Sequence, residues 1–412
     1  MKSNACSMFL ALFSMVASGN VVSAETIRVA LIETLSGPGA APGNWHANHV
    51  QWAVDQVNKA GGVLGGRRIE VVQFDSKSSP QEGLIALKAM TDQGLHFVFG
   101  TAGGSHVALA LTDAIAKHNA RSPESAVLFL NFGAQAPEMT NEKCNFWHFR
   151  FDSHADMRVE ALIRQVAAQK SISKVYLFNQ HYSWGQAVQA HLKSLLTKRL
   201  PHVAIVGDDL IPLQKTKDFA PYVAKIRASG ADTVLTSNWG PDLILLLRAT
   251  HESGLKTNFY TLNAHFIGTP TAIGEAGVGR VVNLSPWHAN AADTKLESYY
   301  LEYKRKYKEE WSTLAAKNAV EMWAKAIDTA HSLDPVAVAK ALEGIRYDAG
   351  TGAMWMRADD HQLMLPQYAY SFAKVGPGVT HDLENTGFGF RTEGRFEADQ
   401  TVLPHTCKME RP

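Results

Sequence analysis

Cysteine, net charge and long apolar runs are all scarce in this chain of 412 residues. It has 40 lysines and arginines against 39 acidic residues, so the formal net charge is only +1. A protein that binds nucleic acid needs a clustered basic excess to neutralise phosphates, and one that binds membrane surfaces needs a basic amphipathic face. Neither pattern is present, and no apolar stretch after residue 24 approaches the length of a membrane span. We therefore expect no nucleic-acid partner and no attachment to a membrane surface.

The first 24 residues have the pattern of a secretory signal peptide. Lys2 supplies a positive charge, residues 8–17 (MFLALFSMVA) are an apolar run too short to span a bilayer, and residues 22–24 (VSA) place small residues at a cleavage point. Cys6 precedes the apolar run instead of following it, which argues against a lipoprotein. We expect an exported protein, free of the membrane and cleaved near Ala24. Because ATP and nicotinamide cofactors are not shared pools outside the cytoplasm, we expect no cofactor.

Two of the three cysteines, Cys144 and Cys407, remain after cleavage. In an oxidising compartment an even pair of cysteines usually forms a disulfide. We expect one bridge that ties the end of the chain to its first half. Two isolated thiols are the alternative, because the sequence does not give the distance between the two residues.

Short β-branched runs alternate with longer segments of helical period, a pattern typical of parallel strands covered by helices. The mature chain of about 388 residues exceeds what one core usually fills, so two α/β domains are expected. The pattern starts afresh after residues 146–151, and no low-complexity linker separates the halves. The predicted strands are Ile27–Ile32, Ile69–Phe74, Phe97–Gly100 and Val127–Phe132, then Val175–Phe178, Val203–Val206, Thr233–Thr236, Phe259–Leu262 and Val281–Leu284.

The loops at the carboxyl ends of these strands are the expected ligand site, since helix N-termini there present positive dipole ends. Residues 36–43 (SGPGAAPG) lack the glycine spacing of a dinucleotide fingerprint, so Ser36 and its neighbouring amides are candidates for a small polar ligand. Gly104 and Ser105 open a helix directly after a strand and suit a carboxylate, although an ordinary helix cap is the alternative.

In the second half, aromatic rings follow the strands: Tyr182 and Trp184 after one, and Trp239 after another. Such rings can line an apolar pocket, and packing in a core or hinge is the alternative for each ring alone. Three rings on matching edges favour a pocket.

An exported hydrolase is the rival from another class. It would need Ser105 as a nucleophile beside His106 as a base, but Val107 stands where the nucleophile elbow has its second glycine. His46 and His49 have no third partner at metal-ligand spacing, so no metal site is predicted. We therefore expect a protein that is not an enzyme.

Several motifs resemble the periplasmic branched-chain amino-acid-binding proteins of ABC transporters, over nearly the whole mature chain. They are the loop at Ser36, residues 53–67 (AVDQVNKAGGVLGGR), Asp75 with Pro80, residues 133–134 with 137–140, Phe149-Arg150, Asp218-Phe219 before Val223, and residues 356–362 (MRADDHQ).

The resemblance implies a type I periplasmic-binding-protein fold, with two Rossmann-like lobes joined by three crossover segments. The implied first lobe is 25–148 plus 266–346, and the implied second lobe is 149–265 plus 347–412. Position by position, Gly104 and Ser105 match the loop for the ligand carboxylate, and Ala134 with Gln135 match a second contact loop. Trp184 and Trp239 match aromatic positions of the second lobe, with Tyr182 close by.

Asn263 falls where the amino-acid binders place the carboxylate that pairs with the ligand ammonium, and Pro42 replaces their first-loop aromatic. A buried ammonium without a negative partner is costly. Unless another acid reaches the site, the ligand can therefore be an aromatic acid or an amide as well as an amino acid. We expect a monomeric receptor that delivers its ligand to a membrane permease. A ligand sensor of the same fold is the alternative.

Overall fold

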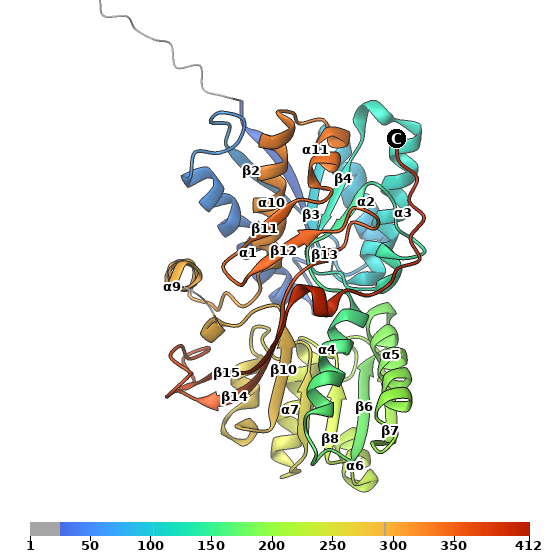
Figure 1. The fold of residues 1–412 in the computed structure, drawn as a ribbon, viewed down its shortest axis with the longest axis vertical. Helices are drawn as coiled ribbons and strands as arrows, with labels where there is room; N and C mark the ends of the chain where they lie inside the picture. The colour runs from blue at the N-terminus through green and yellow to red at the C-terminus, as the bar shows by residue number, and fades with distance from the viewer. Residues whose placement is uncertain (1–24, 102, 292–293) are drawn as a thin grey trace, which may run out of the picture.

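Two lobes, each built on its own sheet, are stacked along the long axis of the molecule (Figure 1). The computed structural model describes residues 25–101, 103–291 and 294–412. The expected signal peptide lies outside the described residues. None of the helices in the described ranges has the length and apolar character needed to cross a membrane.

The first lobe has a five-stranded, all-parallel sheet. Its strands, in spatial order, are β2 (Ile69–Asp75), β1 (Ile27–Glu33), β3 (Phe97–Gly100), β4 (Leu128–Asn131) and β5 (His148–Arg150). Successive residues of a strand point to opposite faces. Ala30 and Ile32 therefore pack on α2 (Pro80–Thr91) and α3 (Ser105–Arg121), while Val29 and Leu31 pack on the side of α1 (Ala40–Lys59) and α10 (Ala315–Ala330).

The second lobe has a seven-stranded sheet that is parallel except at one edge. Its strands, in spatial order, are β15 (Phe388–Phe396), β14 (Gln367–Lys374), β10 (Val281–Ser285), β9 (Asn258–Thr261), β8 (Thr233–Thr236), β6 (Lys174–Gln180) and β7 (Ala204–Ile211). Helices α4 (Ala155–Ala167) and α5 (Ser183–Arg199) cover one face, and α6 (Ala220–Ser229) and α7 (Pro241–Glu252) cover the other. The short α8 (Thr269–Ile273) packs against α7.

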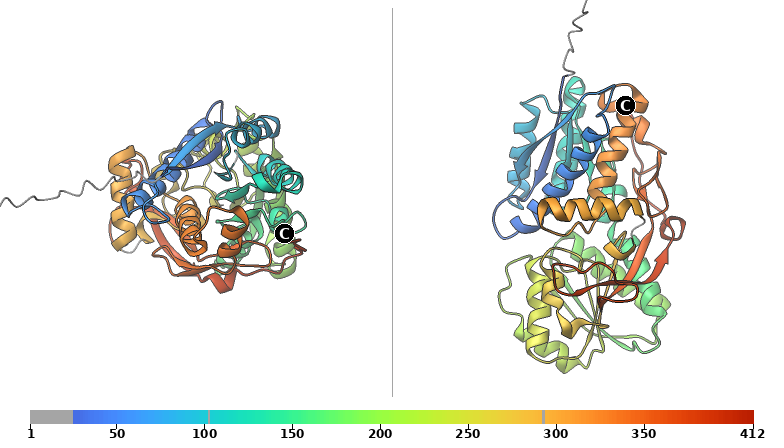
Figure 2. Two further views of the ribbon diagram at one scale, coloured as in Figure 1. Left: turned by 90° about the horizontal axis from the view of Figure 1, so that it is seen from above. Right: turned by 90° about the vertical axis from the view of Figure 1, so that its left-hand side faces the viewer.

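Within the described ranges, three segments cross between the lobes, at residues 151–154, 286–291 and 365–366. After the second crossing, α9 (Thr294–Tyr307) packs its tyrosines on Trp52 of α1, so it belongs to the first lobe (Figure 2). The same lobe contains α11 (Pro335–Leu342) and a small antiparallel sheet of β11 (Arg346–Asp348), β12 (Ala353–Met356) and β13 (Leu363–Met364). An isolated bridge between Arg150 and Gln362 joins this small sheet to β5.

The structure divides the chain differently from the expected lobe boundaries. Phe149 and Arg150, expected in the second lobe, lie in β5 of the first sheet. Strand β10, expected in the first lobe with 266–346, is paired with β9 and β14 in the second sheet. Residues 347–364 and Cys407, expected in the second lobe with 347–412, lie against the first lobe. The reason is that a short, fully buried strand fits either sheet, and only its long-range hydrogen-bond partners decide between them.

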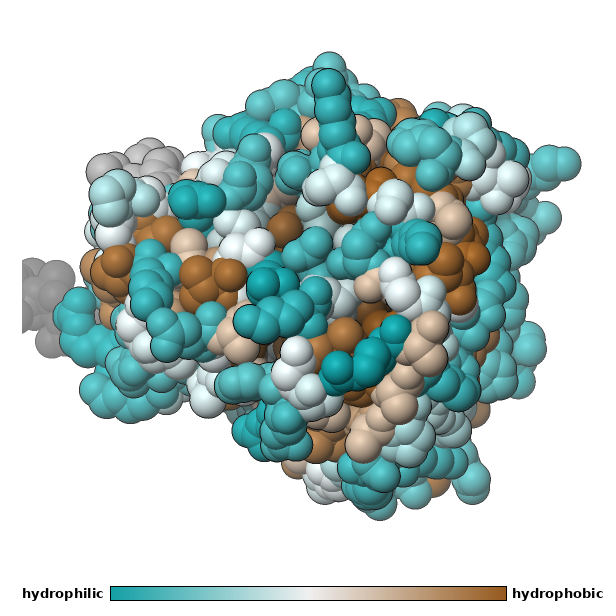
Figure 3. Space-filling model, turned by 90° about the horizontal axis from the view of Figure 1, so that it is seen from below, coloured by the Kyte–Doolittle hydropathy of each residue, from teal (hydrophilic) through white to brown (hydrophobic). Residues whose placement is uncertain are grey.

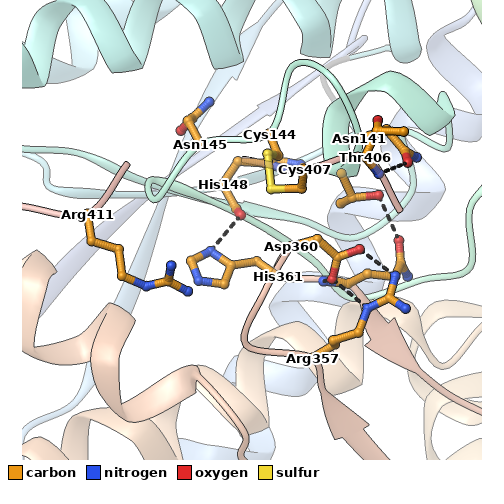
Figure 4. The surroundings of a disulfide bond; sticks show 12 residues. Asn141, Cys144, Asn145, His148, Arg357, Asp360, His361, Thr406, Cys407 and Arg411 are labelled. Carbon is orange, nitrogen blue, oxygen red and sulfur yellow. Dashed lines mark hydrogen bonds and ion pairs between the residues drawn. A yellow bond between two sulfur atoms is a disulfide. The ribbon is translucent and has the colours of Figure 1, made fainter. Parts of the chain in front are cut away.

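The C-terminal tail returns from the second lobe to the first and is covalently attached there (Figure 4). Cys144 and Cys407 form a disulfide with a Cα–Cα distance of 5.6 Å, across 263 residues of sequence, so the expected bridge is confirmed. Beside it, Thr406 donates its backbone N–H to Asn141 Oδ1 at 3.0 Å, and Arg411 donates to Glu343 Oε1 at 3.0 Å. The tail is thus held at several points along the first lobe.

Removing this bridge is expected to destabilise the protein by about 2–4 kcal/mol, because the very long loop is no longer closed in the unfolded chain. The variant is Cys144→Ser with Cys407→Ser, and the measurement is urea unfolding followed by circular dichroism. Dithiothreitol should lower the midpoint of the wild type and leave that of the double variant unchanged. Equal midpoints for wild type and variant without reductant would contradict the prediction.

Seen from the end of the second lobe, the surface is mostly hydrophilic with scattered hydrophobic patches (Figure 3). Exposed large hydrophobic side chains in the described ranges include Ile205 and Leu210 on the edge strand β7, and Leu84 and Ile85 on α2. Isolated exposed hydrophobic residues are normal for a globular surface. A concave feature lined by polar and aromatic side chains lies between the lobes.

Candidate functional site

A cavity lies between the lobes, where the carboxyl ends of the strands of both sheets face each other. It encloses about 770 Å³ of empty space, part of it open to solvent. The first lobe supplies residues that end or follow β1, β3 and β4, and the second lobe supplies residues that follow β6, β8 and β9. Ligands of open α/β sheets bind at this kind of edge.

Seven of the nine residues predicted to bind ligand line this one cavity: Gly104, Ser105, Gln135, Tyr182, Trp184, Trp239 and Asn263. The other two do not. Ser36 is exposed, and its hydroxyl donates to Asp75 Oδ2 at 2.5 Å. Ala134 is buried beside the cavity, and its carbonyl accepts from Asn131 Nδ2 at 2.9 Å. Pro42 and His46 also line the cavity, whereas His49 is buried against Trp45 and Tyr303.

Ser105 is oriented by the loop that follows β4. Its Oγ accepts hydrogen bonds from the backbone N–H groups of Gln135 and Ala136, both at 3.1 Å. A serine hydroxyl has two acceptor sites and one proton to donate. With both acceptor sites used, the proton must be donated elsewhere, and among the described residues no acceptor for it lies within bonding distance. Ser105 is also the first residue of α3, at the positive end of that helix.

The arrangement around Ser105 differs from that of a nucleophile and its base. His106 Nε2 lies 3.0 Å from the backbone oxygen of Ser78 and not from Ser105. Burial lowers the pKa of His106, although the Ser78 contact opposes this shift. In the described part of the chain, this loop therefore contains no serine–histidine hydrogen bond.

The aromatic side chains of the second lobe form a connected wall. Trp239 Nε1 donates to the Tyr182 hydroxyl at 2.8 Å, and Trp184 Nε1 donates to the Ser237 carbonyl at 3.1 Å. The Tyr182 ring meets the His106 ring of the first lobe edge-on, at 5.7 Å between centroids. A Cβ on Gly104 would lie 3.7 Å from the Tyr182 ring, so the two lobes are in van der Waals contact beside the cavity.

Arg158, on α4, is a cavity residue that sequence reasoning missed. It is buried, and its guanidinium donates to Gln135 Oε1 at 2.8 Å, to the Leu284 carbonyl at 2.7 Å and to the Leu262 carbonyl. Because Gln135 belongs to the first lobe and the two carbonyls end strands of the second, this one side chain bridges the lobes. The sequence signal for Arg158 was a charged residue on a helix face that is otherwise apolar.

Two acids in the cavity wall, Asp152 and Glu33, were also missed. Asp152 Oδ2 accepts from Gln135 Nε2 at 2.5 Å, and the Gln135 amide thereby links it to Arg158. Glu33 ends β1, and its carboxyl accepts from the Thr101 N–H at 2.6 Å and from Thr101 Oγ1 at 2.9 Å. Burial raises the pKa of Glu33 to about 7, against the effect of these hydrogen bonds. An acid at the end of an apolar strand was the sequence signal for Glu33.

The fold and the cavity define a class: a two-lobed α/β receptor that encloses a small molecule between its lobes. The chain belongs to the periplasmic binding protein family, whose family model matches residues 26–377. Its members are solute-binding proteins, not enzymes; they work in the periplasm with the permeases of ABC transporters. The predicted two-lobed α/β fold is confirmed.

Individual relatives agree with this assignment. The chain is 32% identical over 403 residues to the Leu/Ile/Val-binding protein homolog 4 of Brucella melitensis, covering 95% of this chain and 94% of that protein. A leucine-, isoleucine-, valine-, threonine- and alanine-binding protein from Brucella ovis, crystallised in a closed conformation, is 30% identical with a TM-score of 0.83, over 94% of this chain and all of that one. A solute-binding protein from Rhodopseudomonas palustris, in complex with 3,4-dihydroxybenzoic acid, shares the fold at 17% identity and a TM-score of 0.78, over 90% of this chain and 98% of that one.

Proposed function

We propose that this protein is the receptor of an ABC importer and encloses a small carboxylate, an amino acid of branched-chain type or a related acid such as an aromatic acid. The observation that carries the proposal is the free donor of Ser105, held at the positive end of α3 and facing a cavity lined by rings. A carboxylate is the group that such a donor and dipole stabilise best. Arg158 Nε, which has no hydrogen-bond partner among the described residues, is a second donor in the same wall.

The role of the receptor follows from the position of the cavity. A ligand that contacts both walls favours the closed arrangement of the lobes, because only that arrangement completes its contacts. The permease would then recognise the closed form. We propose that the mature protein starts after Ala24 and acts as a periplasmic monomer.

Replacing Ser105 with alanine is expected to weaken binding of every carboxylate ligand by about 10- to 100-fold, since one hydrogen bond to a charged group is lost. The measurement is titration with L-leucine, L-phenylalanine and benzoate, monitored by tryptophan fluorescence, because Trp184 and Trp239 line the cavity.

The control is Ser171→Ala, at an exposed serine of the second lobe, which should bind as the wild type does. Thermal unfolding of Ser105→Ala without ligand separates a binding effect from a folding one. Binding of unchanged strength in Ser105→Ala, or no binding of any carboxylate by the wild type, would contradict the proposed function.

A further inference from the structure

Of the charged groups in the cavity wall, the Glu33 carboxyl stands apart because no lysine or arginine of the described residues forms an ion pair with it. Its hydrogen-bond donors are neutral: the Thr101 amide and hydroxyl, and the Thr34 amide at 3.3 Å from Oε2. Among the described residues its ion-pair contact is with His46 Nδ1 at 3.9 Å, beyond hydrogen-bond distance. Burial lowers the pKa of His46 to about 4, so this histidine is neutral near pH 7.

The other acid of the cavity, Asp152, is compensated within the protein. Gln135 donates to Asp152 and accepts from Arg158, so the carboxylate and the guanidinium are coupled through one amide. The Ser153 N–H adds a second donor to Asp152 at 2.7 Å. A ligand cation has little to gain from an acid whose charge is already balanced.

Asn263 is also committed to protein partners. Its Nδ2 donates to the Ser237 carbonyl at 2.8 Å, and its Oδ1 lies 3.5 Å from Arg158 Nη1. A cation placed beside Asn263 would meet the buried guanidinium of Arg158 at short range. The second-lobe wall at this position therefore repels an ammonium instead of attracting one.

We infer that Glu33, in the first-lobe wall, binds the ammonium group of the ligand and so selects amino acids over the corresponding acids that lack nitrogen. The inference rests on the proposed function, because the ligand carboxylate is bound elsewhere, by Ser105. The three donors bonded to the carboxylate are neutral, so its charge is left for a ligand cation to balance. The three bound donors orient the group before the ligand arrives, which limits the cost of ordering it on binding.

The test compares pairs of ligands that differ only in the ammonium: L-leucine with 4-methylpentanoate, and L-phenylalanine with 3-phenylpropanoate. The full mature protein should bind the amino acid of at least one pair about 10-fold or more tightly than its partner. Glu33→Gln should lose about 100-fold or more in affinity for that amino acid, because a buried charge pair loses one member, and should change by less than about 3-fold for the nitrogen-free acid. The control is Glu70→Gln, at an exposed residue of β2.

A pH series on the wild type gives a second test that needs no variant. Affinity for the amino acid should rise as pH increases from 5.5 to 8, since the ligand cation requires the ionised carboxylate and the pKa of Glu33 is about 7. Titratable groups on the elements around Glu33 are His46 on α1, His106 on α3, Asp75 on β2 and His265 across the cavity. Burial lowers the pKa of all three histidines, and the pKa of Asp75 is lowered by hydrogen bonds from Ser36 and Leu35 that outweigh its burial.

The outcomes separate the two claims. If nitrogen-free acids bind the wild type as tightly as amino acids, or if Glu33→Gln keeps its affinity for the amino acid, the role of Glu33 is overturned while the receptor function stands. A flat pH series for the amino acid overturns it too. If neither member of either pair binds, both the role of Glu33 and the proposed function as a carboxylate receptor are contradicted.

Discussion

Acidification from pH 6.5 to about pH 4 is expected to unfold this protein, because many of its histidines are buried in the neutral form. Eight have a pKa lowered by burial: His46, His49, His106, His148, His154, His265, His288 and His361. Below pH 6.5 the unfolded chain gains protons that the folded protein cannot accept. The stability that each histidine contributes is therefore present above its unfolded pKa and is lost as pH falls toward its folded pKa.

The expected loss is large. The pKa of His46 falls from 6.5 to about 4 and that of His288 from 6.5 to about 3, so these two alone cost about 3 and about 5 kcal/mol once the pH is below their folded values. Four acids whose pKa is raised by burial, Glu33, Asp152, Asp156 and Asp242, act in the opposite direction. Glu33 alone adds about 3 kcal/mol as pH falls from 7 to 4.5. The eight histidines outnumber these four acids, and total stability is typically only 5–15 kcal/mol.

The measurement is the free energy of unfolding in urea between pH 7.5 and pH 4.5. His288→Gln keeps a donor for Thr392, whose Oγ1 lies 2.9 Å from the histidine ring, and removes one titrating group. Its stability should fall less steeply with acid, by up to about 1.4 kcal/mol per pH unit. His202→Gln, at an exposed histidine, should follow the wild type. A wild-type stability that stays constant down to pH 5 would rule the explanation out.

Replacing Arg158 with methionine is expected to cost about 3–5 kcal/mol of stability and to abolish closure over the ligand, since it leaves several buried groups without a partner. The carbonyls of Leu262 and Leu284 and the Gln135 amide would lose their donor, and the Asp152 carboxylate would lose its nearby positive charge. Methionine fills a similar volume, so the effect isolates the charge and its hydrogen bonds.

The matched control for Arg158 is Arg164→Met on the same helix, α4. Arg164 is exposed, and a substitution at such a site is normally within about 0.5 kcal/mol. Chemical unfolding gives the stability of both variants, and ligand titration gives their affinities. A loss below about 1 kcal/mol for Arg158→Met would show that the buried network contributes little net stability.

Several elements could be predicted from local sequence because the interactions that form them are local. The bounds of β3 and β8 match the predicted strands, and α1 ends where Gly61 and Gly62, both with positive φ, prevent a further turn. Ser105 and Trp184 were found because each follows a buried strand at the start of a helix. That position reaches the ligand edge of any parallel sheet.

Local sequence could not predict the roles of Glu33 and Arg158 or the sheet to which β10 belongs. The role of each depends on partners far along the chain, such as Thr101 for Glu33 and Leu284 for Arg158. The sheet to which β10 belongs likewise depends on β9 and β14.

The sequence by itself determined the alternation of strands and helices, the loops that could hold a ligand and the cysteines available for a bridge, because spacing and residue type along the chain decide these. Only the tertiary structure decided which lobe holds each segment and which buried charges are balanced. The physical reason is that the free energy of a buried carboxylate or guanidinium depends on what lies within a few ångströms in space, and those neighbours come from distant parts of the chain.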